Sequence, residues 1–150
     1  MRVRVQTGAF DAGQELNAFS QGLEGAGAVV SFTGLVRQAP EGDLIALEIE
    51  HYPGMTERAL EGLRERAMAR FELSDALLIH RYGRLALYEP IVLVATAAPH
   101  REAAFKGADF LMDTLKSNAP FWKKEIRKAG GAWVEPHGRD AKALKRWESS

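Results

Sequence analysis

The segment with the most potential for chemistry is a short basic stretch near the C-terminus. It combines five cations within 13 residues with two aromatic side chains: Lys116, Lys123, Lys124, Arg127 and Lys128, with Phe121 and Trp122. A lysine ammonium binds phosphate or carboxylate, and partial burial lowers its pKa so that it can act as a base or a nucleophile. The aromatic rings could stack on a flat heterocycle. The pattern is equally typical of a solvated basic face with two aromatic residues in the core.

Two further places could bind an anion. His100 and Arg101 stand where an apolar strand ends and a helix begins, and the N–H groups at a helix N-terminus favour anions, as does the arginine fork. Arg37 follows another expected strand and opens a loop that contains Gly and Pro. Loops at strand ends often carry function. The alternatives are a helix-entry residue beside a surface arginine, and a solvated loop arginine.

Several kinds of site are excluded or disfavoured by the residue types present. The chain has no cysteine, which excludes disulfides, thiolate metal sites and a cysteine nucleophile. The four histidines have no metal-ligand spacing, so no metal is expected; they are His51, His80, His100 and His137. His80 lies in an apolar strand and is predicted to be a hydrogen-bonded core residue. No glycine-rich phosphate loop or nucleophile elbow is present.

The elements that must position these residues follow from hydrophobic periodicity and chain breakers. Helices are expected over residues 12–24, 56–71 and 101–116, with Asp11 capping the first. Strands are expected over 28–36, 44–51, 76–82 and 91–97, with a short one at 3–5. Residues 81–89 fit either a strand extension or a loop, the region after Pro120 is ambiguous, and a short helix could cover 140–147. This interleaving indicates a mixed α/β fold.

Length and composition favour one domain over residues 1–150, because 46% of the 150 residues are hydrophobic. The net charge is zero, yet residues 1–75 sum to −5 and residues 76–150 to +5. A basic C-terminal half could present a cationic pocket to an anion, although composition alone favours the simpler interpretation that the charges mix and cancel in space. No apolar run approaches the roughly 18 residues of a membrane span, and no apolar signal segment follows the first residues. A soluble cytoplasmic protein is expected.

Taken in order, five segments resemble the large, catalytic subunit of molybdopterin synthase. They are collinear and span nearly the whole chain: Phe32-Thr33-Gly34-Leu35-Val36-Arg37, Glu50-His51-Tyr52-Pro53-Gly54-Met55-Thr56, His80-Arg81-Tyr82-Gly83, His100-Arg101 followed by Ala104-Phe105, and Asp113-Thr114-Leu115-Lys116 leading into Ala119-Pro120-Phe121-Trp122-Lys123-Lys124-Glu125. Each segment alone is weakly specific. Their order along one chain makes the resemblance specific.

The resemblance implies a single-domain α/β hammerhead fold with mostly antiparallel strands and about three main helices. It implies a homodimer in which each copy binds a small ubiquitin-like sulfur-carrier subunit, giving a heterotetramer. That partner carries a thiocarboxylate on its C-terminal Gly-Gly tail. Two sulfur transfers then convert cyclic pyranopterin monophosphate into the molybdopterin dithiolene of the molybdenum cofactor, and this sulfurtransferase chemistry requires no metal or organic cofactor in the catalytic subunit.

The resemblance also assigns roles to residues of this sequence. Lys116 would be the essential lysine near the partner's terminal glycine, acting as acid–base or transient nucleophile, and Lys123 would bind and polarise substrate. The phosphate and the polar edge of the pterin would be held by Arg37, His100 and Arg101. Phe32 and Met112 would line the channel for tail or substrate.

One segment departs from the family pattern. The family often has an arginine, donated across the dimer, just after the Trp133-Val134-Glu135 segment, and here His137 stands at that position with Arg139 two residues on. We expect Arg139 to replace it, since Gly138 frees the backbone, with His137 as the alternative. From another functional class, a non-catalytic module could use the basic aromatic segment to bind nucleic acid or another anion. The neutral net charge and the clustering of the cations argue against that module.

Overall fold

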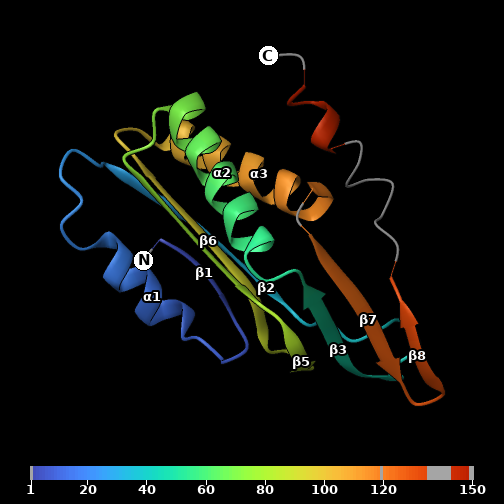
Figure 1. Cartoon of the computed structure of the whole chain (residues 1–150). Helices are drawn as coiled ribbons and strands as arrows, with labels where there is room; N and C mark the ends of the chain where they lie inside the picture. Colours follow the sequence, from blue (N-terminus) through green and yellow to red (C-terminus); the bar gives the residue numbers. More distant parts are fainter. Residues whose placement is uncertain (1, 119, 135–142, 149–150) are drawn as a thin grey trace.

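The computed structural model describes residues 2–118, 120–134 and 143–148. Within them, the chain forms the following strands and helices in order (Figure 1): β1 (Val3–Gln6), α1 (Ala12–Ser20), β2 (Ala28–Leu35), β3 (Leu44–His51), α2 (Met55–Phe71), β4 (Asp75–Arg81), β5 (Gly83–Ala86), β6 (Pro90–Ala98), α3 (Arg101–Asn118), β7 (Phe121–Arg127) and β8 (Gly130–Trp133). None of the described helices is both long and apolar enough to cross a bilayer.

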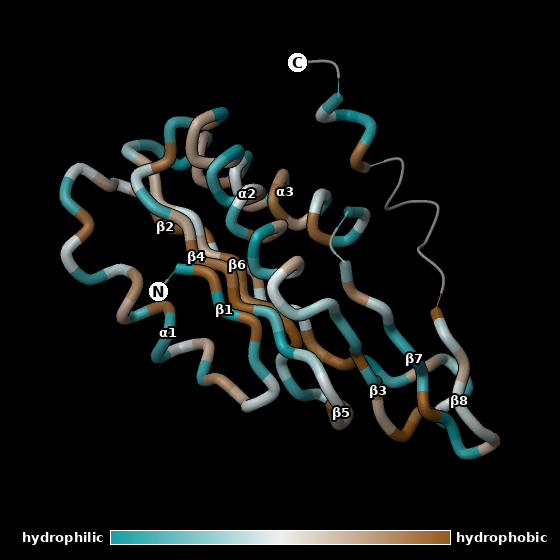
Figure 2. Tube along the Cα trace, in the orientation of Figure 1, coloured by the Kyte–Doolittle hydropathy of each residue, from teal (hydrophilic) through white to brown (hydrophobic). Residues whose placement is uncertain are grey.

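The central sheet has the strand order β1-β4-β6-β2. β1 and β4 are parallel, whereas the β4–β6 and β6–β2 pairs are antiparallel. Helices α2 and α3 cover one face of this sheet, and α1 packs on the other through Phe19. β4 and β6 are therefore buried on both faces, which explains their continuous apolar sequence. The same strands form the most hydrophobic part of the trace in Figure 2.

The outer sheet has the order β5-β3-β7-β8, and all of its pairs are antiparallel. It follows directly from the central sheet, because only Tyr82 separates β4 from β5. Phe121 of β7 contacts the buried cluster of each sheet, and Ile49 and Leu85 fill the space beneath the outer one. The end of β4 and the start of β6 in the central sheet meet β3 and β7 of the outer sheet. We call this place the sheet junction.

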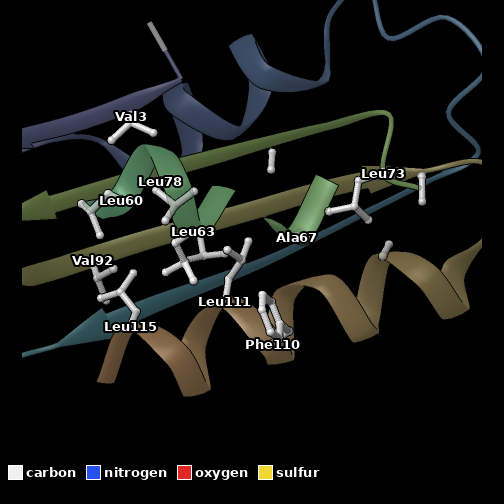
Figure 3. Packing of buried hydrophobic residues seen from close by; sticks show 14 residues of the cluster. Val3, Leu60, Leu63, Ala67, Leu73, Leu78, Val92, Phe110, Leu111 and Leu115 are labelled. Atoms are coloured by element: carbon white, nitrogen blue, oxygen red, sulfur yellow. The ribbon is translucent and has the colours of Figure 1, made fainter. Parts of the chain in front are cut away.

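The main core lies between the central sheet and the two long helices. Leu60 and Leu63 of α2 meet Leu111 and Leu115 of α3 above Leu78 of β4 (Figure 3). Burial of each leucine contributes about 1.5–3 kcal/mol. This packing fixes the direction of α3, which begins where β6 ends and returns along the sheet to the start of β6.

The C-terminal residues 143–148 return to the outside of the helical layer. Trp147 packs edge-on against Phe71 and Phe110, and its indole N–H donates to the Asp113 carboxylate at 2.6 Å. The neighbouring Arg146 pairs with the same carboxylate at 2.7 Å. These contacts fasten the end of the chain to α2 and α3.

The structure confirms a mixed α/β fold with mostly antiparallel strands and three main helices. The Asp11 cap is confirmed, because its carboxylate accepts from the N–H of Gln14. The first helix ends at Ser20 rather than 24, since Gly22 turns the chain with φ 71° and Leu23 leaves the helix to pack near Phe19. Residues 81–89, which fitted either a strand extension or a loop, contain the short strand β5. The ambiguous region after Pro120 forms the β7–β8 hairpin. The described part of the expected tail helix is a single short turn, and 140–142 lie outside the described residues.

Candidate active site

Lys116 lies in the last turn of α3 with its side chain exposed. The preceding residue, Leu115, is buried and lies beside Val92 near the start of β6 (Figure 3). Because consecutive helix residues point about 100° apart, the burial of Leu115 turns Lys116 toward the flank of the helix. Lys116 is thereby fixed at the end of the central sheet that adjoins the sheet junction.

Lys123 lies on β7 directly opposite Ile49 of β3. Opposed residues of an antiparallel pair share one face of the sheet, and Ile49 is only 1% exposed. Lys123 is therefore on the inner face of the outer sheet. It is half-buried there, and its charge acts on His80 of β4. The short connection from α3 to β7 brings both lysines to the same end of the molecule.

Aromatic rings from three strands pack at the sheet junction next to Lys123. The His80 ring stacks on Phe121 with centroids 3.8 Å apart and planes 15° apart. His51 tilts against Tyr82 at 4.3 Å, and its Nδ1 lies 3.0 Å from Oγ1 of Thr56. One face of Phe121 is therefore covered by a histidine. That face is unavailable for the heterocycle stacking considered from the sequence.

His80 is a buried, neutral histidine. Burial lowers its pKa from 6.5 to about 3, the hydrogen bond to the backbone of Arg81 opposes this shift, and the charges of Lys123 and His51 lower the pKa further. Its Nδ1 lies 2.8 Å from the Arg81 carbonyl oxygen. A carbonyl can only accept, so Nδ1 holds the proton and Nε2 has a free lone pair. The sequence-based interpretation of His80 as a hydrogen-bonded core residue is confirmed.

Lys124 and Arg127 of the same basic segment have other surroundings. Strand alternation turns Lys124 away from Lys123, and its Nζ lies 5.8 Å from the ring centroid of Trp133. Trp122, on that same side, packs edge-on against Tyr52 at 4.6 Å. Arg127 is held by three carboxylates, and these hydrogen bonds and charges raise its pKa: Glu41, Asp43 and Glu125. The solvated-face interpretation therefore fits Lys124 and Arg127, and it leaves Lys116 and Lys123 as candidates.

The structure does not bring the expected phosphate-binding residues together within one copy of the chain. Arg37 follows Val36, whose N–H donates to the Glu89 carbonyl just before β6. His100 and Arg101 follow the other end of β6 and are exposed. β6 has nine residues, which corresponds to about 30 Å. Arg37 thus lies at the Lys116 end of the sheet, and His100 and Arg101 lie at the opposite end.

Phe32 and Met112 are placed on one side of the central sheet. Phe32 is in the middle of β2 and 41% exposed. Met112 is on α3, one turn before Lys116, and packs against the edge of the main core. Both lie near the path between the two ends of the sheet, which is compatible with the expected channel. His137 and Arg139 lie outside the described residues.

In the part of the chain that the structure describes, neither metal-ligand geometry nor the pocket beside α2 and α3 gives a competing site. Among the described residues, no three His, Asp or Glu side chains come together as a metal-binding group. A pocket of about 590 Å³ lies between α2, α3 and residues 143–148, and Phe110, Thr114 and Trp147 are among its lining residues. None of the described residues expected to act on substrate lines this pocket. It lies on the α2 side of α3, away from the flank that carries Lys116.

Sequence reasoning did not foresee the group around Lys123. His80 and Phe121 are 41 positions apart, and His51 belongs to the second sheet. The sequence did place these residues within the segments that resemble the family. That resemblance does not say which residues contact one another in the folded chain. Only the sheet registers bring them together.

Comparison with known proteins identifies the family. The model of the MoaE protein family matches residues 5–118. The chain belongs to the MoaE protein family. It is 57% identical over 147 residues to a molybdopterin synthase catalytic subunit from Cereibacter sphaeroides, covering 98% of this chain and all of that one.

Solved structures of MoaE proteins have the same fold. A MoaE protein from Burkholderia ambifaria is 43% identical, with a TM-score of 0.82 and coverage of 99% of this chain and 98% of that one. A molybdopterin synthase structure from Staphylococcus aureus gives a TM-score of 0.82 at 28% identity, covering 90% of this chain and 98% of that one. The match to the MoaE family model ends at residue 118 and does not include β7 or Lys123. The similarity of that segment to known proteins is seen in the relatives that align over the full chain.

Proposed function

We propose that this chain is the catalytic subunit of a molybdopterin synthase. It transfers sulfur from the C-terminal Gly-Gly thiocarboxylate of a small ubiquitin-like partner to cyclic pyranopterin monophosphate, in the cytoplasm. The observation that carries the proposal is full-length similarity to catalytic subunits of this name. The position of Lys116 and Lys123 at one end of the fold supports it. Two copies of the chain with two partners form the working heterotetramer.

The two lysines divide the work according to their surroundings. Lys116 is exposed on the helix flank, where an incoming peptide terminus can reach it, and it acts as the acid–base group or transient nucleophile in acyl transfer. Lys123 is half-buried beside a neutral histidine, so its charge is less screened and polarises the substrate. In each transfer, the thiocarboxylate sulfur forms a carbon–sulfur bond on the pterin side chain while a carbon–oxygen bond of that side chain breaks. Water then cleaves the bond between the sulfur and the partner's carbonyl carbon, so the sulfur stays on the pterin and the partner's terminus becomes a carboxylate.

The nucleic-acid module finds no support in this geometry. The cations of the basic segment divide between the two faces of β7, and Arg127 is already held by carboxylates. Among the described residues, the segment therefore forms no continuous cationic stripe of the kind that follows a phosphate backbone.

The direct test is reconstitution. The protein is mixed with a thiocarboxylated ubiquitin-like partner and cyclic pyranopterin monophosphate, and formation of the dithiolene is followed. Product is expected only when the partner carries sulfur. A partner ending in an ordinary carboxylate is the matched control, and equal results with both partners, or no product with either, contradict the function.

The role of Lys116 is tested by replacing it. Lys116→Ala should reduce turnover by about 100-fold or more, because a general acid–base contributes at least on that order. Lys116→Arg keeps the charge but cannot lose its proton, so it should stay close to the alanine variant. Lys106→Ala is the control, since Lys106 lies on the same helix and pairs only with exposed Glu102 among the described contacts. Turnover above about a tenth of wild type in Lys116→Ala would remove this residue from the chemistry.

A further inference from the structure

His51, the last residue of β3, is held in one orientation by the start of α2 (Figure 1). The Tyr52 carbonyl accepts from both the backbone N–H and the hydroxyl of Thr56, at 2.9 and 2.8 Å. The hydroxyl proton of Thr56 is therefore used, and its oxygen can only accept from Nδ1 of His51, 3.0 Å away. Nδ1 thus carries the ring proton, and Nε2 keeps a free lone pair.

Nε2 of His51 is open to solvent. The ring is half-buried, packs against Tyr82 and lies 6.2 Å from the Phe121 ring. Among the described residues, Nε2 has no hydrogen-bond partner, and the only buried side-chain nitrogen or oxygen that lacks one is Nε of Arg4. Water can therefore reach Nε2. An imidazole with a fixed Nδ1 proton and an open Nε2 is the form that accepts a proton in general base catalysis.

The register of the outer sheet places this imidazole beside Lys123. His51 pairs with Phe121 of β7. Lys123, two residues further along β7, pairs with Ile49. His51 and Lys123 are therefore diagonal neighbours on the inner face of the sheet, with Cβ atoms within about 7–8 Å. This separation leaves room for a water molecule and the carbonyl that it attacks between the imidazole and the ammonium.

His80, the other histidine at the sheet junction, is unsuited to proton transfer. Burial lowers its pKa to about 3, and a group with so low a pKa is a weak base at neutral pH. Its Nδ1 proton is held by a backbone carbonyl, as that of His51 is held by a hydroxyl. The two rings thus have the same tautomer, and the difference in burial leaves His51 as the available base.

We propose that His51 is the general base for the hydrolytic step of sulfur transfer, an inference that rests on the proposed function. Before this step, sulfur joins the partner's carbonyl carbon to the pterin. Nε2 takes one proton from water while the water oxygen attacks that carbon. The bond from carbon to sulfur then breaks, and the sulfur stays on the pterin as a thiolate. The partner's terminus becomes a carboxylic acid, and this acid and the imidazolium each lose a proton to solvent. Thr56 is a positioning residue, because it acts only through the imidazole.

The thioester that this step consumes provides the test. In a single turnover with thiocarboxylated partner and cyclic pyranopterin monophosphate, His51→Gln should accumulate the partner–pterin thioester, detected by intact mass after quenching. Hydrolysis should slow by about 100-fold or more, because the base is missing. Glutamine can still donate to Thr56 but has no basic nitrogen. Thr56→Val should slow the same step by roughly 10-fold, since misplaced groups lose rate, and Thr56→Ser should restore it.

Thr96→Val is the matched control for Thr56→Val. Both threonines are 0% exposed, and the Thr96 hydroxyl donates to the Ala104 carbonyl at 2.6 Å. Thr96 lies toward the end of β6 that is remote from the sheet junction. The two substitutions should lower stability to urea by similar amounts, and only Thr56→Val should accumulate the thioester.

A second variant separates a base from a packing residue. Imidazole added to His51→Ala should restore hydrolysis, whereas pyrazole, which has the same size but is far less basic, should not. Hydrolysis at the wild-type rate in His51→Gln, equal thioester in Thr96→Val, or equal restoration by pyrazole would overturn the role of His51. If wild-type protein makes dithiolene, any of these results contradicts this inference alone. If it makes none, the proposed function fails and the inference fails with it.

Discussion

A single buried side chain, His80, makes stability depend on pH. Its folded-state pKa is about 3, against 6.5 for the free side chain. The unfolded chain therefore binds the extra proton first as pH falls, so the contribution of His80 is complete above pH 6.5 and is lost progressively down to pH 3. Between pH 7 and pH 5, the wild-type free energy of unfolding should fall by about 2 kcal/mol from this residue alone.

His80→Gln supplies the comparison, because an amide can still donate to the Arg81 carbonyl but does not titrate. Urea unfolding of both proteins at pH 7 and pH 5 should show the smaller loss in the variant. Glu41 and Glu89 have lowered pKa values, so they titrate at lower pH. Both proteins contain them, so their contributions to the pH dependence cancel when the two proteins are compared. The same loss in both proteins would show that His80 is not buried as described.

At the level of single residues, the sequence predicted the chemical character of a side chain better than its position in the folded protein. The apolar surroundings of His80 in the sequence indicated a core histidine, and the structure agrees. The adjacent pair Lys123 and Lys124 could not be divided into inner and outer residues without the register of β7, because alternation alone does not say which face is covered. The sequence also grouped Arg127 with the site cations. Its ion-pair partner Asp43 is 84 positions away, so the pairing could not be seen in the sequence.

Among the elements, Arg81 joins three segments at the sheet junction. It is 6% exposed, and its guanidinium donates to the Thr7 carbonyl at 2.9 Å, to Glu89 at 3.0 Å and to the Pro90 carbonyl at 3.3 Å. Arg81→Gln removes most of these bonds and leaves two carbonyls short of a donor. The expected loss is about 2–4 kcal/mol in the free energy of unfolding, measured by chemical denaturation.

Arg84→Gln is the control for this prediction. Arg84 lies on the neighbouring strand β5, is exposed, and faces Glu48 across the strand pair. Surface substitutions of this kind usually change stability by less than about 0.5 kcal/mol. Comparable losses in the two variants would show that charge, rather than the bridging position of Arg81, determines the effect.

The long elements were predictable because each repeats one pattern over many residues. α2, α3, β3 and β6 begin and end within a residue or two of expectation, since their apolar periodicity is set by the core. β5 and β8 have four residues each, and β8 begins with two glycines, so neither has enough length to show a period. Their strand pairing is imposed by β3 and β7, which is a tertiary effect that local sequence does not contain.

For the whole molecule, the question is whether a working site needs two copies of the chain. Lys116 and Arg101 lie at opposite ends of the 18-residue helix α3. If each site takes Lys116 from one copy and Arg101 from the other, two inactive variants can repair each other. Lys116→Ala alone removes the proposed catalytic group from both sites of a dimer. If Arg101 binds the phosphate as expected, Arg101→Ala alone removes a charge-assisted contact from both sites and lowers kcat/KM by about 10-fold or more.

A mixture of the two variants separates the possibilities. After subunit exchange, half of the dimers contain one copy of each variant, and in these one site is doubly altered while the other has both natural residues. At limiting substrate, the mixture should therefore recover about a quarter of the wild-type rate per site. The double variant Lys116→Ala with Arg101→Ala, mixed with wild type, is the control. Exchange should lower the rate of this mixture from about a half to about a quarter of wild type, because its mixed dimers contain no fully natural site, whereas exchange raises the rate of the two single variants. Subunit exchange is verified by mass. If the mixture of the two single variants is then no more active than the variants alone, Arg101 does not act across the dimer.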